Sequence, residues 1–258
     1  MNEQTRQENP IEGDPEVENP TGWAKSTPTI HVGEVPPGAT NINVDGRKRA
    51  GALQGFGRLW QKTYKVRLTG ADKTPPEIMQ IWKEKFADFQ PPENHFYPPM
   101  AGIKPNDILF ISAKVPALPG TPSILPVNSG VTVLYVDENQ FTVMTPEGFP
   151  VSGWNTFSVM EDEDGTPVAQ VQSLERSSDP IYEMFDRYFG SATQQEKIWK
   201  TVLGNLAAHL GLQGEISFSK VCVDPKIQWG AARNIWKNAG ARTMVYALGA
   251  PLRWLQRK

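Results

Sequence analysis

The sequence predicts an α+β fold in which an antiparallel sheet wraps around a long C-terminal helix. Alternating apolar and polar residues recur in four short segments between residues 129 and 177, which is typical of an antiparallel meander. A long helical pattern follows, and its wide apolar stripe needs a surface as large as a sheet to cover it. A strand and a helix precede the meander, so the expected order is strand, helix, several strands, helix.

The first 57 residues lack the pattern of a folded element. Residues 1–40 are rich in Pro, Glu, Asn and Thr without apolar periodicity, which predicts a disordered N-terminal arm. Residues 41–57 form a basic, glycine-rich lead-in that lacks the strand and the GK[ST] ending of a phosphate-binding loop. We assign residues 58–222 to the folded domain and 223–258 to a basic amphipathic helical tail.

The early elements of the domain follow from alternation and capping signals. A strand is expected at 60–69, where basic residues alternate with Tyr64, Val66 and Leu68. Thr74 is a candidate cap for the next helix, whose first turn contains two prolines. A long loop, a strand, and a loop or small flap are then expected at 90–105, 107–115 and 117–130.

The long helix is expected to start near Thr193 and to stop at Gly211. Its apolar stripe consists of Ile198, Trp199, Val202, Leu203, Leu206, Ala207 and Leu210. In the tail, one side is formed by Ala232, Ile235, Trp236, Ala239 and Tyr246. We expect this second stripe to pack on the domain, on a membrane surface or on a partner.

Composition excludes several classes of protein. The net charge of −2 does not suit a general nucleic-acid binder, so no nucleic-acid partner is expected. The single cysteine, Cys222, excludes an internal disulfide and a cysteine-based metal cluster, which fits a reducing compartment. No apolar run is long enough to span a membrane. The expected location is therefore cytoplasmic, with peripheral membrane association open because residues 226–258 contain seven bases and no acid.

The usual catalytic and metal-binding signatures are absent from the sequence. None of the three histidines has a partner at HExxH spacing, and there is no GxSxG nucleophile motif. The acidic run 161–164 lacks the spacing of a calcium loop and is better explained as a hairpin turn with Gly165. We therefore expect no metal, no cofactor and no catalytic residues.

Aromatic residues on the meander and on the helices after it are the candidate site. Small-molecule sites are usually apolar cavities with a few polar groups. The candidate lining residues are Tyr135, Phe141, Trp154, Phe157, Tyr182 and Trp199. The alternative is that these rings fill an ordinary core. Alternation leaves open which face of strand 153–159 points inward: either Trp154, Thr156 and Ser158, or Asn155, Phe157 and Val159.

The stretch from Thr145 to Gln195 resembles a bacterial and plant family of unknown function within the START-like helix-grip superfamily (SRPBCC). The matching positions are Gly148, Pro150, Gly153, Phe157, Asp164, Gly165, Val168, Ser173, Arg176 and Gln195. On the strength of this match, Arg176 joins the candidate pocket. The chain departs from the family motif at a histidine, which is Phe149 here, and at paired glutamates, which are Trp154 and Asn155.

The resemblance implies a cavity between sheet and helix that binds or carries a hydrophobic small molecule or lipid. One alternative is a cyclase- or aromatase-like enzyme that uses the same pocket, and paired ionisable residues inside the pocket would favour it. The other is a peripheral membrane or assembly module, in which residues 226–258 contact an anionic surface or a protein. Because no catalytic signature is present, binding is favoured over catalysis.

Overall fold

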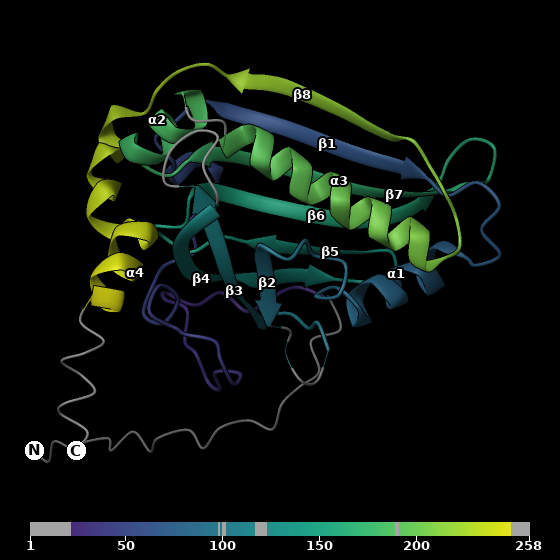
Figure 1. The fold of residues 1–258 in the computed structure, drawn as a ribbon, viewed down its shortest axis with the longest axis horizontal. Helices are drawn as coiled ribbons and strands as arrows, with labels where there is room; N and C mark the ends of the chain where they lie inside the picture. Colours follow the sequence, from purple (N-terminus) through teal and green to yellow (C-terminus); the bar gives the residue numbers. More distant parts are fainter. Residues whose placement is uncertain (1–21, 98, 100–101, 117–122, 189–190, 249–258) are drawn as a thin grey trace, which may run out of the picture.

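The architecture is a curved antiparallel sheet with a long helix across one face (Figure 1). The structure is a computed structural model that describes residues 22–248, apart from 98, 100–101, 117–122 and 189–190. In the described part of the chain, eight strands pair in the order β2-β3-β4-β5-β6-β7-β1-β8. Their bounds are β1 Leu59–Arg67, β2 Asn94–Tyr97, β3 Ile108–Pro116, β4 Ser123–Val136, β5 Gln140–Met144, β6 Val151–Glu161, β7 Pro167–Ser177 and β8 Ile216–Asp224.

Helices cover the sheet and its ends. They are η1 Ala52–Gln54, α1 Pro75–Glu84, α2 Pro180–Tyr188, α3 Ser191–His209, η2 Trp229–Lys237 and α4 Ala239–Leu248. The long helix α3 contacts β1, β7 and β8, and we call the sheet face that it covers the concave face (Figure 1). This is the helix-grip α+β arrangement that the sequence predicts.

Both main helices form for the reasons that the sequence indicates. At the start of α1, the Thr74 backbone N–H donates to the Glu77 carboxylate at 2.8 Å, as in a capping box. The apolar face of α1 is buried through Ile78 and Trp82. In α3, the predicted stripe is buried at Trp199, Val202, Leu203, Leu206 and Ala207. The two helices therefore contribute to one hydrophobic core on the concave face.

Two segments predicted as loops contain strands. Within residues 90–105, β2 pairs with β3 and buries Phe96. This strand has only four residues and lies among prolines, so it is too short to be recognised from periodicity. Within residues 117–130, β4 begins at Ser123 and pairs with β3 through Pro126. β5 pairs with β4 only from Thr132 onwards, so no described strand lies next to Pro126 on the side away from β3. Proline lacks a backbone N–H, and this is tolerated at such an unpaired edge.

The described part of the N-terminal segment, residues 22–40, packs on the sheet, although the sequence predicts it to be disordered. Ile30 and Val32 are buried with Val44 and Phe110 in a second hydrophobic cluster. Trp23 pairs with Tyr135 of β4 through a β-bridge and a ring contact with centroids 4.7 Å apart. The prediction of a disordered arm is therefore wrong for residues 22–40, because isolated apolar residues without periodicity still find partners on the sheet. Residues 1–21 lie outside the described part.

The C-terminal region also departs from the prediction. Strand β8 extends the sheet beyond β1 and crosses the predicted domain boundary at residue 222. The expected continuous helix is divided into η2 and α4, and Trp236 is 86% exposed, whereas Ala239 is fully buried. Helix α4 packs on β4 (Figure 1), and Asn43 donates hydrogen bonds to the Ala239 and Asn128 carbonyls at 3.1 and 2.7 Å. The described part of the tail therefore docks on the domain.

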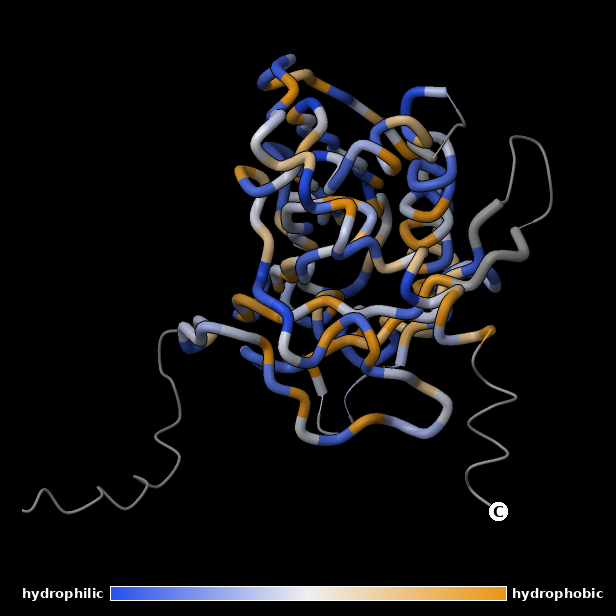
Figure 2. The backbone as a smooth tube through the Cα atoms, turned by 90° about the vertical axis from the view of Figure 1, so that its left-hand side faces the viewer, coloured by the Kyte–Doolittle hydropathy of each residue, from blue (hydrophilic) through white to orange (hydrophobic). Residues whose placement is uncertain are grey.

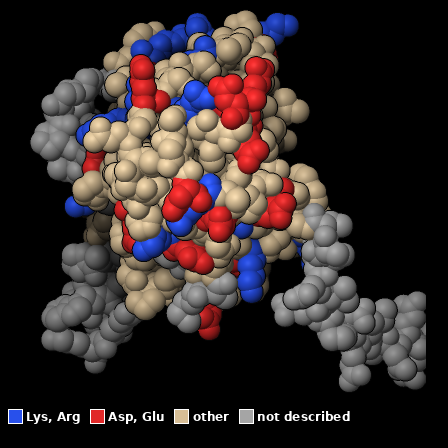
Figure 3. All heavy atoms as spheres, turned by 90° about the vertical axis from the view of Figure 1, so that its right-hand side faces the viewer, with Lys and Arg blue, Asp and Glu red and all other residues tan. Residues whose placement is uncertain are grey.

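The surface is mixed in character. Among the described residues, no helix combines the length and apolar character that crossing a membrane requires. Apolar and polar positions alternate along the chain instead of separating into long blocks (Figure 2). On the face shown in Figure 3, acidic and basic side chains are intermixed.

Candidate small-molecule site

The register of three neighbouring strands determines which side chains point towards α3. On β1, Tyr64 and Val66 are buried in the phase that also contains Lys62. Tyr64 pairs with Val171 on β7, and Val171 pairs with Phe157 on β6. The concave face of β6 is therefore the one with Asn155, Phe157 and Val159.

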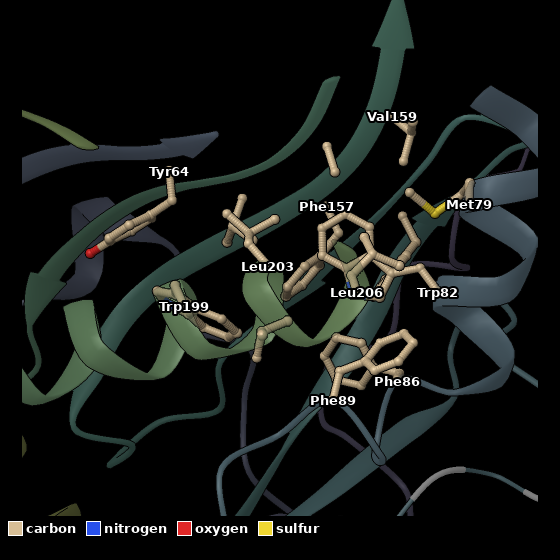
Figure 4. Packing of buried hydrophobic residues seen from close by; sticks show 14 of the residues in the cluster. Tyr64, Met79, Trp82, Phe86, Phe89, Phe157, Val159, Trp199, Leu203 and Leu206 are labelled. Carbon is tan, nitrogen blue, oxygen red and sulfur yellow. The ribbon is translucent and has the colours of Figure 1, made fainter. Parts of the chain in front are cut away.

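The half of the concave face next to α1 is filled by aromatic rings. Phe141 and Phe157 stack with centroids 4.6 Å apart, and Trp199 meets Phe157 edge-on at 5.4 Å. Trp82 on α1 and Phe86, which lies just after this helix, close the cluster (Figure 4). Such edge-on and stacked contacts are those of a close-packed core. This half of the interior is occupied by the protein itself.

The other half contains a buried ionic group. Lys62 and Glu175 are 4% and 3% exposed, and the Lys62 ammonium donates to the Glu175 carboxylate at 2.7 Å. Gln195 on α3 accepts from Lys62 at 2.5 Å and donates to Glu175 at 2.9 Å. The three side chains close a ring that joins β1, β7 and the first turns of α3. Burying two charges is unfavourable unless both are paired, as they are here.

Four buried polar atoms in this half of the concave face have no hydrogen-bond partner among the described residues: Tyr64 OH, Ser173 Oγ, Asn155 Oδ1 and Trp199 Nε1. A fifth unpaired atom, Trp82 Nε1, lies in the aromatic half. Ser173 is the direct strand partner of both Lys62 and Asn155. Since buried polar atoms are nearly always paired, each such atom calls for an explanation, and a group outside the described chain is one. In the strand register, Ser173, Asn155 and Tyr64 therefore occupy positions near the ionic group, and Trp199 lies one helical turn after Gln195.

Tyr64 lies where the two halves meet. Its hydroxyl is directed away from the packed rings of Phe157 and Trp82 (Figure 4). Burial raises the pKa of Tyr64, and the negative charges of Glu175 and Glu196 raise it further. The hydroxyl therefore keeps its proton at neutral pH and remains a hydrogen-bond donor.

A shallow surface groove of about 530 Å³ lies on α3 and is lined by Thr193, Glu196, Lys197, Lys200 and Thr201. Phe218 of β8 connects this groove with the interior, because its ring stacks on Tyr64 at 4.8 Å and lies 5.7 Å from the Lys200 ammonium. The Phe218 ring thus lies between the Tyr64 side chain and Lys200, which lines the groove.

The residues predicted to line the pocket divide into three groups, of which two lie on the strands β5–β7 and the helix α3. Phe141, Phe157 and Trp199 meet on the concave face, within the packed core. Trp154 and Arg176 belong to the opposite strand phase and point to the convex face, where Arg176 donates to the Gly57 carbonyl at 2.7 Å and to Asp224 at 2.5 Å. These two lie on the outside of the sheet because strand side chains alternate between faces.

The remaining two predicted residues lie away from the interior. Tyr135 contacts Trp23 of the N-terminal segment. Tyr182 on α2 accepts a hydrogen bond from the Gly240 N–H at 3.0 Å, at the junction with α4. Both take part in docking terminal segments onto the sheet.

Sequence reasoning did not assign Lys62 or Glu175 to the site. A signal was present, because Lys62 shares the strand phase of Tyr64 and Val66, and Glu175 shares that of Ala169 and Val171. When one strand has a basic residue and another strand has an acidic residue, each at a position where apolar residues are expected, the two residues indicate a buried ion pair. Ser173 and Gln195 were noted as motif positions, and both lie at this pair. In the described chain, no group of three or more His, Cys, Asp or Glu side chains suits a metal ion.

Comparisons with known proteins concern the fold alone. No protein-family model matches the chain, and no curated protein matches it. Among solved structures, a START superfamily protein from Mycobacterium smegmatis aligns at TM-score 0.41 and 17% identity over 59% of this chain and 99% of that chain. The major latex-like protein 151 from Panax ginseng aligns at TM-score 0.39 and 10% identity, covering 59% and 98%.

A third structure, the di-domain ARO/CYC protein StfQ of the steffimycin biosynthetic pathway, aligns at TM-score 0.40 and 9% identity over 60% of this chain and 53% of that one. At such scores and identities these likenesses carry no argument about ligand or activity. The helix-grip description rests on the order and packing of the elements themselves. The closer resemblance to a family of unknown function stays a prediction from the sequence, because no family model matches the chain.

Proposed function

We propose that this protein binds an amphipathic small molecule between α3 and the β8-β1-β7 part of the sheet. The polar end would lie at the ring of Lys62, Glu175 and Gln195, and the apolar body would lie along the groove beside Phe218. The observation that supports this most directly is the set of four unpaired polar atoms on a buried face. An ordinary core would place apolar side chains there, because an unpaired buried polar atom costs about 1–3 kcal/mol.

The position of the site agrees with the general form of small-molecule sites. Such sites combine apolar walls with a few convergent polar groups. Here the walls include Phe218 and Trp199, and the polar groups come from β1, β6, β7 and α3. Since the aromatic half is closed by packing, the ligand would occupy the polar half and the groove, not the whole interior.

Ser173→Ala tests the proposal with little structural disturbance. The change removes an unpaired hydroxyl, so the free energy of unfolding should stay equal or rise slightly. An environment-sensitive apolar dye should bind the parent with saturable stoichiometry, and the variant should bind it several-fold more weakly. Ser219→Ala, on the exposed convex side of β8, is the matched control and should change neither quantity. Equal dye affinity in parent and Ser173→Ala would overturn the position of the site.

Native mass spectrometry of protein purified from its own host provides an independent test. A retained ligand would appear as an added mass that disappears on denaturation. Extraction of the bound ligand into an organic solvent would then allow its chemical identity to be determined.

The buried Lys62–Glu175 pair favours a second function of another class, acid–base catalysis on the bound molecule. Catalytic sites frequently contain pairs of ionisable residues. Glu175→Gln separates the two functions, since it retains the shape of the side chain. A binding protein should retain a ligand of the same mass in parent and variant. An enzyme should release product from the parent, and the variant should accumulate a compound of different mass.

A further inference from the structure

We infer that the polar end of the ligand is an oxyanion, most simply a carboxylate, so that the ligand is an amphipathic organic acid. This inference rests on the proposed site and specifies its ligand class. Three observations support it: the charges on the concave face, the hydrogen-bonding character of the unpaired atoms, and the position of a second lysine on β8.

The charges of the concave face near α3 are unequal. Lys62 on β1 is the direct strand partner of Lys220 on β8, so two lysine side chains start from paired positions in the same strand phase. Glu175 is the single carboxylate in this phase of β1, β7 and β8 within their described bounds. The pair of Lys62 and Glu175 is neutral, which leaves the charge of Lys220 in excess.

Lys220 is held at the edge of the site. Its ammonium lies 4.0 Å from the centre of the Trp60 ring, and Trp60 is the strand partner of Glu175. The cation–π contact fixes the direction of this side chain without neutralising its charge. The other lysines of the groove are paired, Lys200 with Glu196 at 2.6 Å and Lys197 with Glu93 at 3.5 Å. Lys220 is thus the cation most available to a ligand.

The unpaired atoms are mainly donors. Trp199 Nε1 can only donate, and the hydroxyls of Tyr64 and Ser173 both carry a proton to donate. Lys62 has three N–H bonds and uses two of them within the ring. Asn155 Oδ1 is the only one of the four unpaired atoms that can act solely as an acceptor, and it suits a hydroxyl next to the acid group. A site of this composition suits a ligand group that accepts several hydrogen bonds and bears a negative charge. A carboxylate has both properties, whereas a protonated amine has neither.

Binding of three probes with the same alkyl chain tests the inference: dodecanoic acid, dodecanol and dodecylamine. At neutral pH the acid is ionised, because a free carboxyl group titrates near pH ~4.3. Titrations of the full chain would be followed by tryptophan fluorescence, with calorimetry as a second measurement. We expect the acid to bind about tenfold more tightly than the alcohol, which corresponds to roughly 1.4 kcal/mol, and the amine to bind most weakly.

Lys220→Met assigns the preference to the site. It should lower the affinity for the acid several-fold and leave the affinity for the alcohol unchanged. The matched control is Lys65→Met, because Lys65 is an exposed lysine between Tyr64 and Val66 whose side chain lies on the convex side of β1. This variant should bind all three probes as the parent does. Both variants change surface side chains, so both should fold.

Each result is decisive. A preference for the acid that Lys220→Met abolishes and Lys65→Met preserves supports the inference. Equal binding of acid, alcohol and amine overturns it and leaves the proposed binding function intact. A preference lost equally in both lysine variants also overturns it, since general surface charge would then be the cause. If no probe binds, the inference and the proposed site fail together.

Discussion

At the residue scale, the concave face combines groups that stabilise the fold with groups that do not. Tyr64 and Ser173 are fully buried and leave their hydroxyls unpaired, whereas Lys62 and Glu175 are buried and hydrogen-bonded to each other and to Gln195. A buried ion pair adds little net stability over an apolar pair, but removal of one partner is strongly unfavourable. The residues of the candidate site therefore respond to substitution in different directions.

Glu175→Leu should destabilise the protein strongly. It leaves the Lys62 ammonium buried beside a single amide oxygen, and we expect the free energy of unfolding to fall by about 3–5 kcal/mol. The double variant Lys62→Met/Glu175→Leu removes both charges and should recover most of that loss. Urea unfolding of the three proteins measures both values. A double variant as unstable as the single one would show that an unpaired charge is not the cause.

Tyr64, which is buried, and Tyr182, which is half-buried, should respond to loss of the hydroxyl with stability changes of opposite sign. Tyr64→Phe removes an unpaired hydroxyl and should leave stability equal or raise it by up to about 1 kcal/mol. Tyr182→Phe removes the acceptor of the Gly240 N–H and should lower stability by about 1 kcal/mol. Thermal unfolding at neutral pH compares them. A loss of equal size in both variants would mean that the Tyr64 hydroxyl has a partner.

Tyr64 should also contribute to alkaline unfolding. Its pKa is raised in the folded protein by burial and by nearby carboxylates, whereas an unfolded tyrosine ionises near pH ~10. The folded state then binds the proton more tightly, so stability is fully present below pH ~10 and is lost as pH rises above it. Tyr64→Phe should reduce that loss, as measured by urea unfolding at a series of alkaline pH values. An unchanged pH dependence would contradict the assignment.

At the scale of elements, the junction between the meander and the tail is unusually close. Gly148 has φ +88°, and a Cβ atom there would lie 1.9 Å from the Lys237 carbonyl oxygen. The Ala239 N–H donates to the Gly148 carbonyl at 2.8 Å, and Asn238 donates to the buried Asp179 at 2.8 Å. A glycine of the β5–β6 turn therefore provides the space in which the end of η2 docks.

Gly148→Ala should displace η2 and α4 from the sheet. Gly165→Ala is a matched control, because Gly165 has a similar φ of +75° but no atom within 4 Å of its Cβ position. Both variants incur the left-handed strain of about 1–2 kcal/mol, and only Gly148→Ala should lose more than this. Melting temperatures give the difference, and limited proteolysis should cut the tail earlier in Gly148→Ala. Equal losses in both variants would argue against close docking.

At the scale of the whole molecule, two hydrophobic clusters share one sheet. The large cluster lies between the sheet, α1 and α3, and the small one joins Ile30 and Val32 to Val44 and Phe110. Arg49 adds polar contacts within the same region, to the Thr27 hydroxyl at 3.3 Å and to Asn106 at 3.1 Å. Residues 22–40 thus belong to the folded body.

Truncation separates these N-terminal regions. A chain that begins at residue 41 should be less stable than one that begins at residue 22, because two buried aliphatic side chains are lost, each contributing about 1.5–3 kcal/mol. Urea unfolding of both chains gives the difference, with Ile30→Ala in the full chain as a check on folding. Equal stability would show that the small cluster adds nothing and would restore the expectation of a dispensable arm.

The sequence alone determines the fold class, the capped helix α1, the stripe of α3 and the hairpin turn at Gly165, because local periodicity and turn chemistry encode them. It also identifies Phe141, Phe157 and Trp199 as interior candidates. Only the tertiary structure decides the face of each strand, since a period of two leaves both faces open. It likewise decides β2, β8, the docking of residues 22–40, and the pair of Lys62 and Glu175, which are 113 residues apart. These features depend on which distant segments meet, and local patterns do not contain that information.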